Sequence, residues 1–102
     1  MSEWRDAADA AVVVEDEVLG CVVDGLPVAL FRVEGEVFAL HDLCSHGHAR
    51  LSEGFVEDGC VECPLHQGLV DIRTGAARTA PISEPVRSIP AREVGGRIEV
   101  RI

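Results

Sequence analysis

Two short segments of the chain each offer one cysteine thiol and one histidine imidazole. They are Cys44-Ser45-His46 and Cys63-Pro64-Leu65-His66, and sixteen residues separate His46 from Cys63. Alternate residues of an extended segment point to the same side, so Cys44 and His46 can face one centre. Two thiolates and two imidazoles suit a [2Fe-2S] cluster in which histidines replace the cysteines on one iron. The same four residue types also form structural zinc sites.

The spacing favours the iron–sulfur cluster over zinc. Zinc fingers usually pair cysteine with cysteine and histidine with histidine on a helix, whereas each segment here carries one residue of each type. Pro64 helps to fix a turn that brings His66 beside Cys63. If the two segments lie side by side, the two sulfurs converge on one iron and the two imidazoles on the other. A zinc-stabilised interaction module stays open as an alternative, and a colourless purified protein would support it.

The elements that must position these segments are short strands separated by tight turns. Pairs such as Asp24-Gly25 between β-rich runs are typical of hairpins, because glycine accepts the positive φ of the turn. An opening segment over Trp4–Ala11 has room for a short first strand. The further predicted strands are Val18–Val23, Leu26–Val33, Glu36–Leu40, Gly54–Glu57, Cys60–Glu62, Leu69–Ile72, Val86–Glu93 and Arg97–Ile102. The pattern predicts an all-β fold, a small antiparallel sandwich or barrel.

The length and the charge of the chain limit its architecture and its partners. With 102 residues it is predicted to form one domain, residues 1–102. The net charge is −9, and the first sixty residues carry thirteen acidic and three basic side chains. Such acidity disfavours binding to nucleic acid and to anionic membrane surfaces. It suits transient docking on a basic patch of a protein partner, although solubility alone also explains it.

The N-terminus and the cysteine usage predict a cytoplasmic protein. The first ten residues contain no basic region followed by an apolar one, so no secretory signal is expected. No apolar run approaches the roughly 18 residues of a membrane span. In a reducing cytoplasm, four cysteines indicate metal binding rather than disulfides.

Several residues with similar chemistry are interpreted as structural. His48 is expected in an exposed loop, within reach of a docking partner, and His41 is expected to cap a strand end or face solvent. Cys21 and Cys60 fall in predicted strands, where an unmodified cysteine commonly behaves as a small buried hydrophobe. The run Glu15-Asp16-Glu17 is interpreted as a solvated turn, with docking as a secondary reading.

The pattern Cys-x-His followed by Cys-x-x-His resembles the motif of Rieske proteins. The wider stretches 44–54 and 63–68 resemble the Rieske ferredoxins of bacterial aromatic-ring-hydroxylating dioxygenases, the naphthalene-type systems most closely. The likeness covers nearly the whole chain and includes Trp4, Phe38-Ala39-Leu40, Thr74-Gly75 and Pro81.

This resemblance implies a Rieske fold, with an antiparallel base and a cluster-binding subdomain of two loops over about residues 41–70. It also implies which residues hold the cluster: Cys44 and Cys63 would bind one iron, and His46 and His66 the other. The loop that contains Pro81 would cover the cluster.

Two departures from the high-potential Rieske proteins of respiratory complexes bear on the reduction potential. Leu65 stands where those proteins have a disulfide cysteine, and Gln67-Gly68-Leu69 stands where they have hydroxyl residues that hydrogen-bond the cluster sulfurs. Such hydrogen bonds stabilise the reduced, more negative cluster, so their loss lowers the potential. We expect a value toward the low end of the Rieske range of about −150 to +300 mV.

The residues and the resemblance together imply an electron carrier rather than an enzyme. A Rieske oxygenase also needs a mononuclear iron, typically held by two histidines and a carboxylate, but only His41 and His48 remain here. No glycine-rich nucleotide fingerprint is present. The implied role is transfer of single electrons from a flavin-containing NAD(P)H reductase to the terminal oxygenase of an aromatic-ring dioxygenase, by a monomer that meets both partners transiently. An electron-transfer subunit of another enzyme, such as a nitrite reductase or a monooxygenase, stays open.

Overall fold

The computed structural model describes residues 3–44, 49–64, 67–80, 82 and 84–102, and these residues are mostly β-structure. Every predicted strand between Val18 and Ile72 begins and ends within one residue of its predicted bounds. Two short 3-10 helices, η1 (Ala10–Val12) and η2 (Leu51–Glu53), accompany the strands. The strands are β1 (Trp4–Asp9), β2 (Val18–Val23), β3 (Leu26–Val33), β4 (Glu36–His41), β5 (Phe55–Glu57), β6 (Cys60–Glu62), β7 (Leu69–Asp71), β8 (Ser88–Ile89), β9 (Ala91–Val94) and β10 (Arg97–Arg101).

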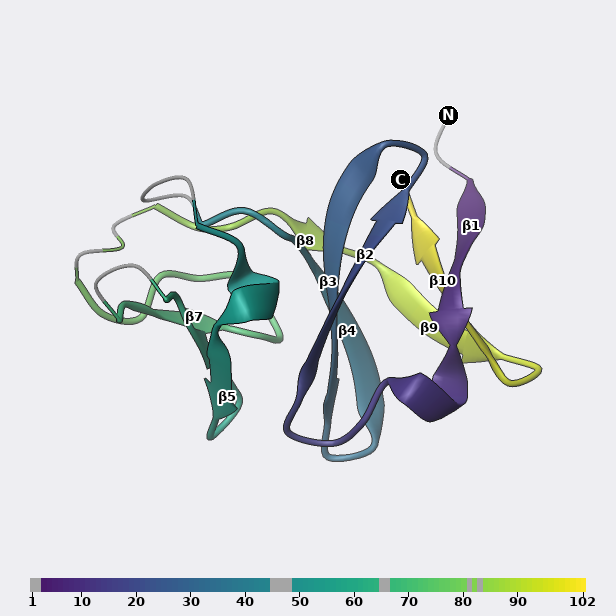
Figure 1. The fold of residues 1–102 in the computed structure, drawn as a ribbon, viewed down its shortest axis with the longest axis horizontal. Helices are drawn as coiled ribbons and strands as arrows, with labels where there is room; N and C mark the ends of the chain where they lie inside the picture. The colour runs from purple at the N-terminus through teal and green to yellow at the C-terminus, as the bar shows by residue number, and fades with distance from the viewer. Residues whose placement is uncertain (1–2, 45–48, 65–66, 81, 83) are drawn as a thin grey trace.

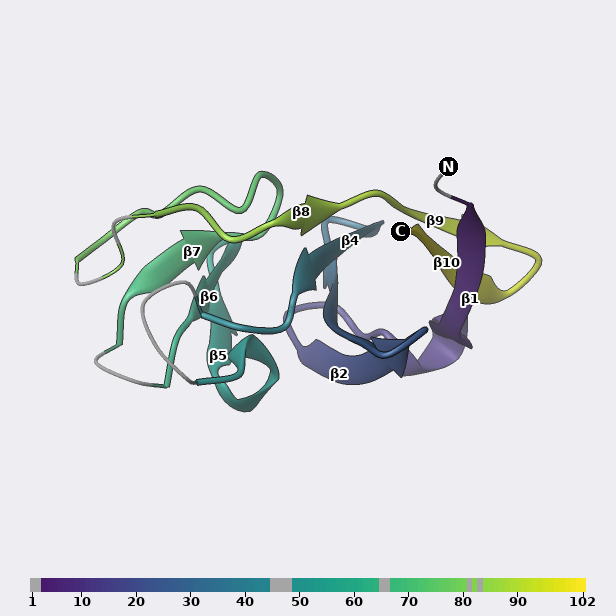
Figure 2. The same ribbon diagram turned by 90° about the horizontal axis from the view of Figure 1, so that it is seen from above.

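The strands form three antiparallel sheets, which confirms the predicted all-β fold. Their orders are β1-β10-β9, β2-β3-β4-β8 and β5-β6-β7. The two views show the β5-β6-β7 sheet at one end of the molecule, the β1-β10-β9 sheet at the other, and the four-stranded sheet between them (Figures 1 and 2). Among the described residues, no helix is long and apolar enough to cross a membrane.

The β5-β6-β7 sheet belongs to a segment inserted between two neighbouring strands. The chain leaves the four-stranded sheet after β4 and returns at β8, where Ala39 pairs with Ile89 and Leu40 with Ser88. One more backbone hydrogen bond, from His41 N to the Arg87 carbonyl at 2.9 Å, closes the neck of this segment. We call residues 42–87 the insertion. Both predicted ligand segments lie within it.

The prediction of one continuous strand over Val86–Glu93 is wrong. Two strands replace it, β8 and β9, and Pro90 lies between them. Proline has no N–H to donate to a sheet, so the ladder must break there. β8 pairs with β4 and β9 pairs with β10, while the Pro90 carbonyl accepts a hydrogen bond from Arg101 N at 3.0 Å. The chain therefore crosses from one sheet to the next at Pro90.

Strand β3 is buried on both faces and separates two hydrophobic cores. Because successive side chains of a strand point to opposite faces, Phe31 packs into one core and Leu30 into the other. The first core contains Ala29, Phe31, Val33, Leu40, Cys44, Leu51, Val61, Cys63, Val70, Ile72, Ile82 and Val86. The second core contains Val13, Val23, Val28, Leu30, Ala39, Ile89, Ile98 and Val100.

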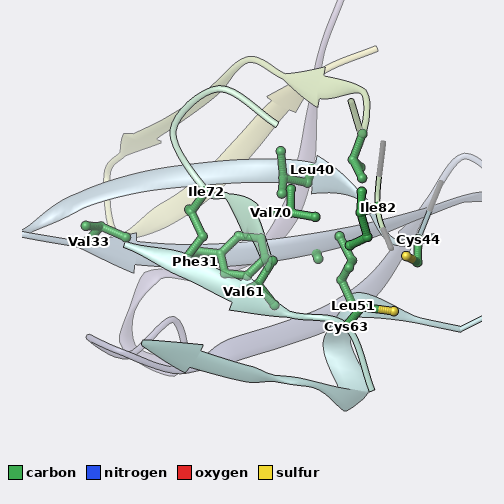
Figure 3. Close-up of a cluster of buried hydrophobic side chains, with 12 residues drawn as sticks. Phe31, Val33, Leu40, Cys44, Leu51, Val61, Cys63, Val70, Ile72 and Ile82 are labelled. Atoms are coloured by element: carbon green, nitrogen blue, oxygen red, sulfur yellow. The ribbon is translucent and has the colours of Figure 1, made fainter. Parts of the chain in front are cut away.

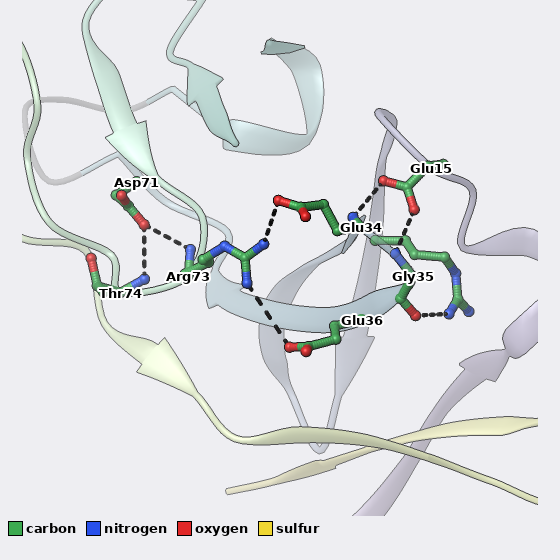
Figure 4. Close-up of polar contacts among 8 residues, drawn as sticks. Glu15, Glu34, Gly35, Glu36, Asp71, Arg73 and Thr74 are labelled. Atoms are coloured by element: carbon green, nitrogen blue, oxygen red, sulfur yellow. Dashed lines mark hydrogen bonds and ion pairs between the residues drawn. The ribbon is translucent and has the colours of Figure 1, made fainter. Parts of the chain in front are cut away.

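The turn between β3 and β4 receives polar contacts from two distant segments (Figure 4). Glu15 is exposed, as expected of a solvated turn, but its carboxylate also accepts hydrogen bonds from Glu34 N and Gly35 N, both at 2.8 Å. From the insertion, Arg73 reaches Glu34 at 3.1 Å and Glu36 at 3.9 Å. The exposed Arg73 contacts connect the insertion to the four-stranded sheet at the end of that sheet away from the neck.

Candidate metal centre

The two predicted cysteine ligands are buried at one end of the first core. Cys44 is 3% exposed and Cys63 is fully buried. Figure 3 shows both sulfur atoms at the end of this core where Leu51 and Ile82 lie, and Val33 at the opposite end. Two thiols that lie far apart in the sequence therefore share one apolar environment.

Each of these cysteines opens a loop, and both loops are closed in the same way. The backbone N–H of Cys44 donates to the Ala49 carbonyl at 2.9 Å, and that of Cys63 donates to the Gly68 carbonyl at 2.8 Å. In each case the acceptor lies five residues further along the chain. The other two predicted ligands, His46 and His66, fall between donor and acceptor in the sequence but lie outside the described residues, as does His48. The described residues thus supply two matching loop closures, each around one histidine of the motif.

The first loop is anchored beyond its closure by η2. Leu51, the first residue of η2, is fully buried in the first core beside the cysteines. The N–H of Gly54 then donates to the Leu51 carbonyl at 2.9 Å and ends the short helix. A β-carbon at Gly54 would stand 1.9 Å from the Glu62 carbonyl oxygen, so only glycine lets β6 approach this closely. Since β6 leads directly to Cys63, this contact brings the two loops together.

A third segment also reaches the cysteines. Ile82 is 4% exposed and packs in the first core next to them, whereas Pro81, the residue predicted to lie in a covering loop, is outside the described residues. Gly75 starts this segment at a φ of +80°, donating its N–H to the Asp71 carbonyl and accepting from Val86 N, both at 2.8 Å. The segment is therefore held at both ends while Ile82 packs against the site.

The remaining cysteines lie in strands, as predicted, and do not join Cys44 and Cys63. Cys21 is in β2 and Cys60 in β6, and both are partly exposed. Burial raises the pKa of both thiols, and the carboxylate of Asp42 adds to the effect at Cys21. All four cysteines are among the described residues, and none forms a disulfide.

An acidic cleft of about 650 Å³ lies between the β3–β4 turn and the β5–β6 hairpin. Val33 lines it, so it lies at the end of the first core away from the cysteines. Arg73 also lines the cleft. The carboxylates that line it belong to Glu15, Asp16, Glu34, Glu57, Asp58 and Asp71. Within the described ranges, no three or more histidine, cysteine or acidic side chains gather as a metal site.

The donor chemistry fits an iron–sulfur cluster. Two thiols meet at a buried, apolar end of a core, and each opens a loop that also carries one histidine of the motif. Sulfur and imidazole are the ligands of a mixed [2Fe-2S] centre. An antiparallel base with two such loops defines a Rieske-type iron–sulfur protein.

The chain belongs to the Rieske family: residues 3–90 match the family described as the Rieske [2Fe-2S] domain. It carries one Rieske-type [2Fe-2S] cluster, which decides against the zinc alternative. It is 59% identical over 102 residues to the anthranilate 1,2-dioxygenase ferredoxin subunit of Burkholderia cepacia, covering 100% of this chain and 94% of that protein. It is 43% identical over 98 residues to the ferredoxin component of the naphthalene 1,2-dioxygenase system of Pseudomonas aeruginosa, covering 96% of this chain and 94% of that protein.

Solved structures of ferredoxins share the fold. The Sphingomonas yanoikuyae B1 ferredoxin has a TM-score of 0.92 and 31% identity, covering 98% of this chain and 99% of that one. A chain in the complex of reduced oxygenase and oxidized ferredoxin in carbazole 1,9a-dioxygenase has a TM-score of 0.87 and 29% identity. The match covers 95% of this chain and 91% of that one. The predicted resemblance to ferredoxins of aromatic-ring dioxygenases is confirmed, and so is the prediction of an electron-transfer component rather than an enzyme.

Proposed function

We propose that this chain carries single electrons from a flavin-containing NAD(P)H reductase to the terminal oxygenase of a multicomponent aromatic-ring dioxygenase. The observation that carries the proposal is the placement of Cys44 and Cys63, buried at one end of the first core, each at the start of a loop closed in the same way. The similarity to two dioxygenase ferredoxins and to a chain in a complex of oxygenase and ferredoxin supports the choice of system.

In this proposal Cys44 and Cys63 bind one iron, and His46 and His66 bind the other. The cluster, when bound, accepts and returns one electron at a time. The chain's own contribution is to bury both sulfur ligands among apolar side chains and to hold both loops by backbone hydrogen bonds. The ligand loops form a cluster-binding subdomain of about residues 41–70 within a single domain.

Variants of the four ligands test this assignment. We expect Cys44→Ser, Cys63→Ser, His46→Asn and His66→Asn each to remove the visible absorption bands and the low-average-g EPR signal of the reduced protein. Cys21→Ser, Cys60→Ser and His48→Asn are the matched controls and retain both. A control that loses its cluster while one of the four ligand variants keeps it would contradict the assignment.

The reduction potential is proposed to lie at the low end of the Rieske range of about −150 to +300 mV. Its basis is the sequence Gln67-Gly68-Leu69, which offers no hydroxyl group to the cluster sulfurs after the second loop. Protein-film voltammetry near neutral pH measures the midpoint, and a value well above zero would refute the proposal.

The partners, the oligomeric state and the location are also proposals. The net charge of −9 favours brief encounters with basic surfaces on the reductase and the oxygenase. Four cysteines without a disulfide favour a reducing cytoplasm, and the carrier is proposed to act as a monomer. The decisive experiment mixes the purified protein with candidate reductases and oxygenases and measures NADH-dependent hydroxylation of an aromatic substrate. Product formation at the same rate without this chain would contradict the proposed role.

A further inference from the structure

A buried carboxylate lies beside the first ligand loop. Asp42 is 1% exposed, and it is the one charged side chain buried to this degree among the described residues. Its Oδ1 accepts a hydrogen bond from Ser52 N at 2.7 Å, and its Oδ2 accepts one from Ser52 Oγ at 2.5 Å. A buried carboxylate is costly unless hydrogen bonds replace its water, so these two contacts are what make the position tolerable.

The two partners stand at the two ends of the loop. Asp42 directly follows β4 and precedes Cys44 by two residues, while Ser52 is the second residue of η2. Their hydrogen bonds therefore enclose the inner closure from Cys44 N to the Ala49 carbonyl. The backbone of Asp42 is itself fixed, because its N–H donates to the Pro27 carbonyl at 2.9 Å. The loop is thus tied to the four-stranded sheet through one residue.

Strand β2 packs directly on this pair of residues. A β-carbon at Gly20 would stand 2.7 Å from Ser52 Oγ, 2.8 Å from Ser52 Cβ and 3.2 Å from Asp42 Oδ2. Gly20 has no positive φ, so its role is to leave room rather than to permit a turn. Among the described residues, Arg50 lies within ion-pair distance of the carboxylate: its Nη1 is 3.9 Å from Oδ2, and its side chain is half exposed. Hydrogen bonds and close packing, more than an ion pair, hold Asp42 in place.

We propose that Asp42 and Ser52 form the positioning pair of the first ligand loop, seated on β2 at Gly20. The pair fixes the separation of the two loop ends and so holds the backbone of Cys44 in the cluster-binding conformation. Asp42 acts through the loop and is not itself a ligand. The inference rests on the proposed assignment of Cys44 and His46 as ligands.

The test compares single variants of the cluster-loaded protein. Asp42→Ala removes both hydrogen bonds and Ser52→Ala removes the one from Oγ. Gly20→Ala forces Ser52 away while every residue of the loop keeps its identity. Asp42→Asn is the conservative variant, because its amide keeps one acceptor for Ser52 N and gains a donor for Ser52 Oγ. The matched control is Asp9→Ala, which removes a similar bond, from Ala11 N to Asp9 Oδ1 at 2.8 Å, at a 3-10 helix far along the chain from both cysteines.

Two readouts report on the loop rather than on overall stability. The first is the rate at which the visible bands fade in excess iron chelator, with the EPR spectrum of the reduced protein recorded alongside. We expect Asp42→Ala and Ser52→Ala to accelerate fading on the order of tenfold, because hydrogen bonds to a charged group are among the strong ones. Gly20→Ala accelerates it in the same direction and shifts the EPR g-values. Asp42→Asn stays closer to the wild type than Asp42→Ala, and Asp9→Ala is unchanged.

The second readout is amide hydrogen exchange, measured by mass spectrometry on the peptide spanning residues 43–53. Faster exchange in Ser52→Ala than in Asp9→Ala supports the pair even in a preparation with little cluster. Fading rates and exchange equal to the wild type in Ser52→Ala and Asp42→Ala would overturn the inference. A wild-type protein that binds no cluster refutes the ligand assignment, and the exchange comparison then decides the positioning role on its own.

Discussion

The backbone approaches Gly75 so closely that adding a single methyl group there should lower the stability of the fold strongly. A β-carbon at Gly75 would lie 2.1 Å from the Val86 carbonyl oxygen, and the residue also has a φ of +80°. Gly75→Ala therefore meets two penalties at once. Two other glycines allow the two penalties to be measured one at a time. Gly25 has a φ of +81° with nothing within 4 Å, and Gly54 has a close contact without a positive φ.

The magnitudes follow from these contacts. An alanine at positive φ costs about 1 kcal/mol, which is the whole effect expected of Gly25→Ala. Forcing apart backbone atoms that are 2.1 Å from the new carbon adds about 1–3 kcal/mol, the usual cost of overpacking. Gly75→Ala should thus cost about 2–4 kcal/mol. At about 4 °C per kcal/mol for a chain of this size, the unfolding midpoint falls by about 8–16 °C, against about 4 °C for Gly25→Ala.

The assay is thermal unfolding of the cluster-loaded protein at one scan rate, followed by circular dichroism and by the visible bands. Because Gly75 begins the segment that brings Ile82 to the cysteines, the visible bands of Gly75→Ala should fade at or before the loss of β-structure. Gly54→Ala meets the close contact alone, so its fall in unfolding midpoint should equal the difference between the falls of Gly75→Ala and Gly25→Ala. Equal midpoints for Gly75→Ala and Gly25→Ala would refute the role assigned to the close approach.

Three further predictions test the core, the thiols and the surface. Leu51→Ala truncates a fully buried side chain and should lower the free energy of unfolding by about 2–5 kcal/mol in a denaturant titration; a loss below about 1 kcal/mol would contradict its role as the loop anchor. Burial raises the pKa of the Cys60 thiol, so iodoacetamide at pH 8 should modify it more slowly in the native than in the unfolded protein, and equal rates would refute this. Hydrogen bonds from Arg97 hold the pKa of Asp6 below its ordinary value of 3.8, so this group stabilises the fold above that pH and the benefit disappears as the pH falls through the lowered pKa. The stability difference between wild type and Asp6→Asn should therefore shrink between pH 6 and pH 3, and a constant difference would contradict the pairing.

Local chemistry made the strands predictable from the sequence. At the β2–β3 turn, Asp24 and Gly25 have φ values of 49° and 81°, the positive values for which such residues are chosen in hairpins. Pro90 is a comparable local signal, because a residue without an N–H inside a predicted strand indicates a break in the ladder. The prediction of a continuous strand gave this signal too little weight. Structure that depends on neighbouring residues, such as hairpin turns and strand ends, can therefore be predicted from the sequence.

Contacts between distant segments were not predictable in the same way. The cysteine and histidine spacing indicated the ligand loops, but nothing in the sequence marks Gly20 as the glycine that Ser52 approaches. Likewise, Glu15 looked like part of a solvated run, and its partners Glu34 and Gly35 are about twenty positions away. Such roles depend on how the sheets pack, which requires the structure.

The burial of β3 on both faces has a consequence for how long a copy of the protein survives. Phe31 and Leu30 are fully buried on opposite faces of that strand, so loosening of the first core exposes the strand on which the second core also depends. A copy that never receives its cluster lacks the bonds proposed to link Cys44 and Cys63 through one iron, and we expect opening there to spread through the whole chain. Proteases act on such opened copies, so abundance should follow the supply of iron and sulfide as well as the rate of synthesis.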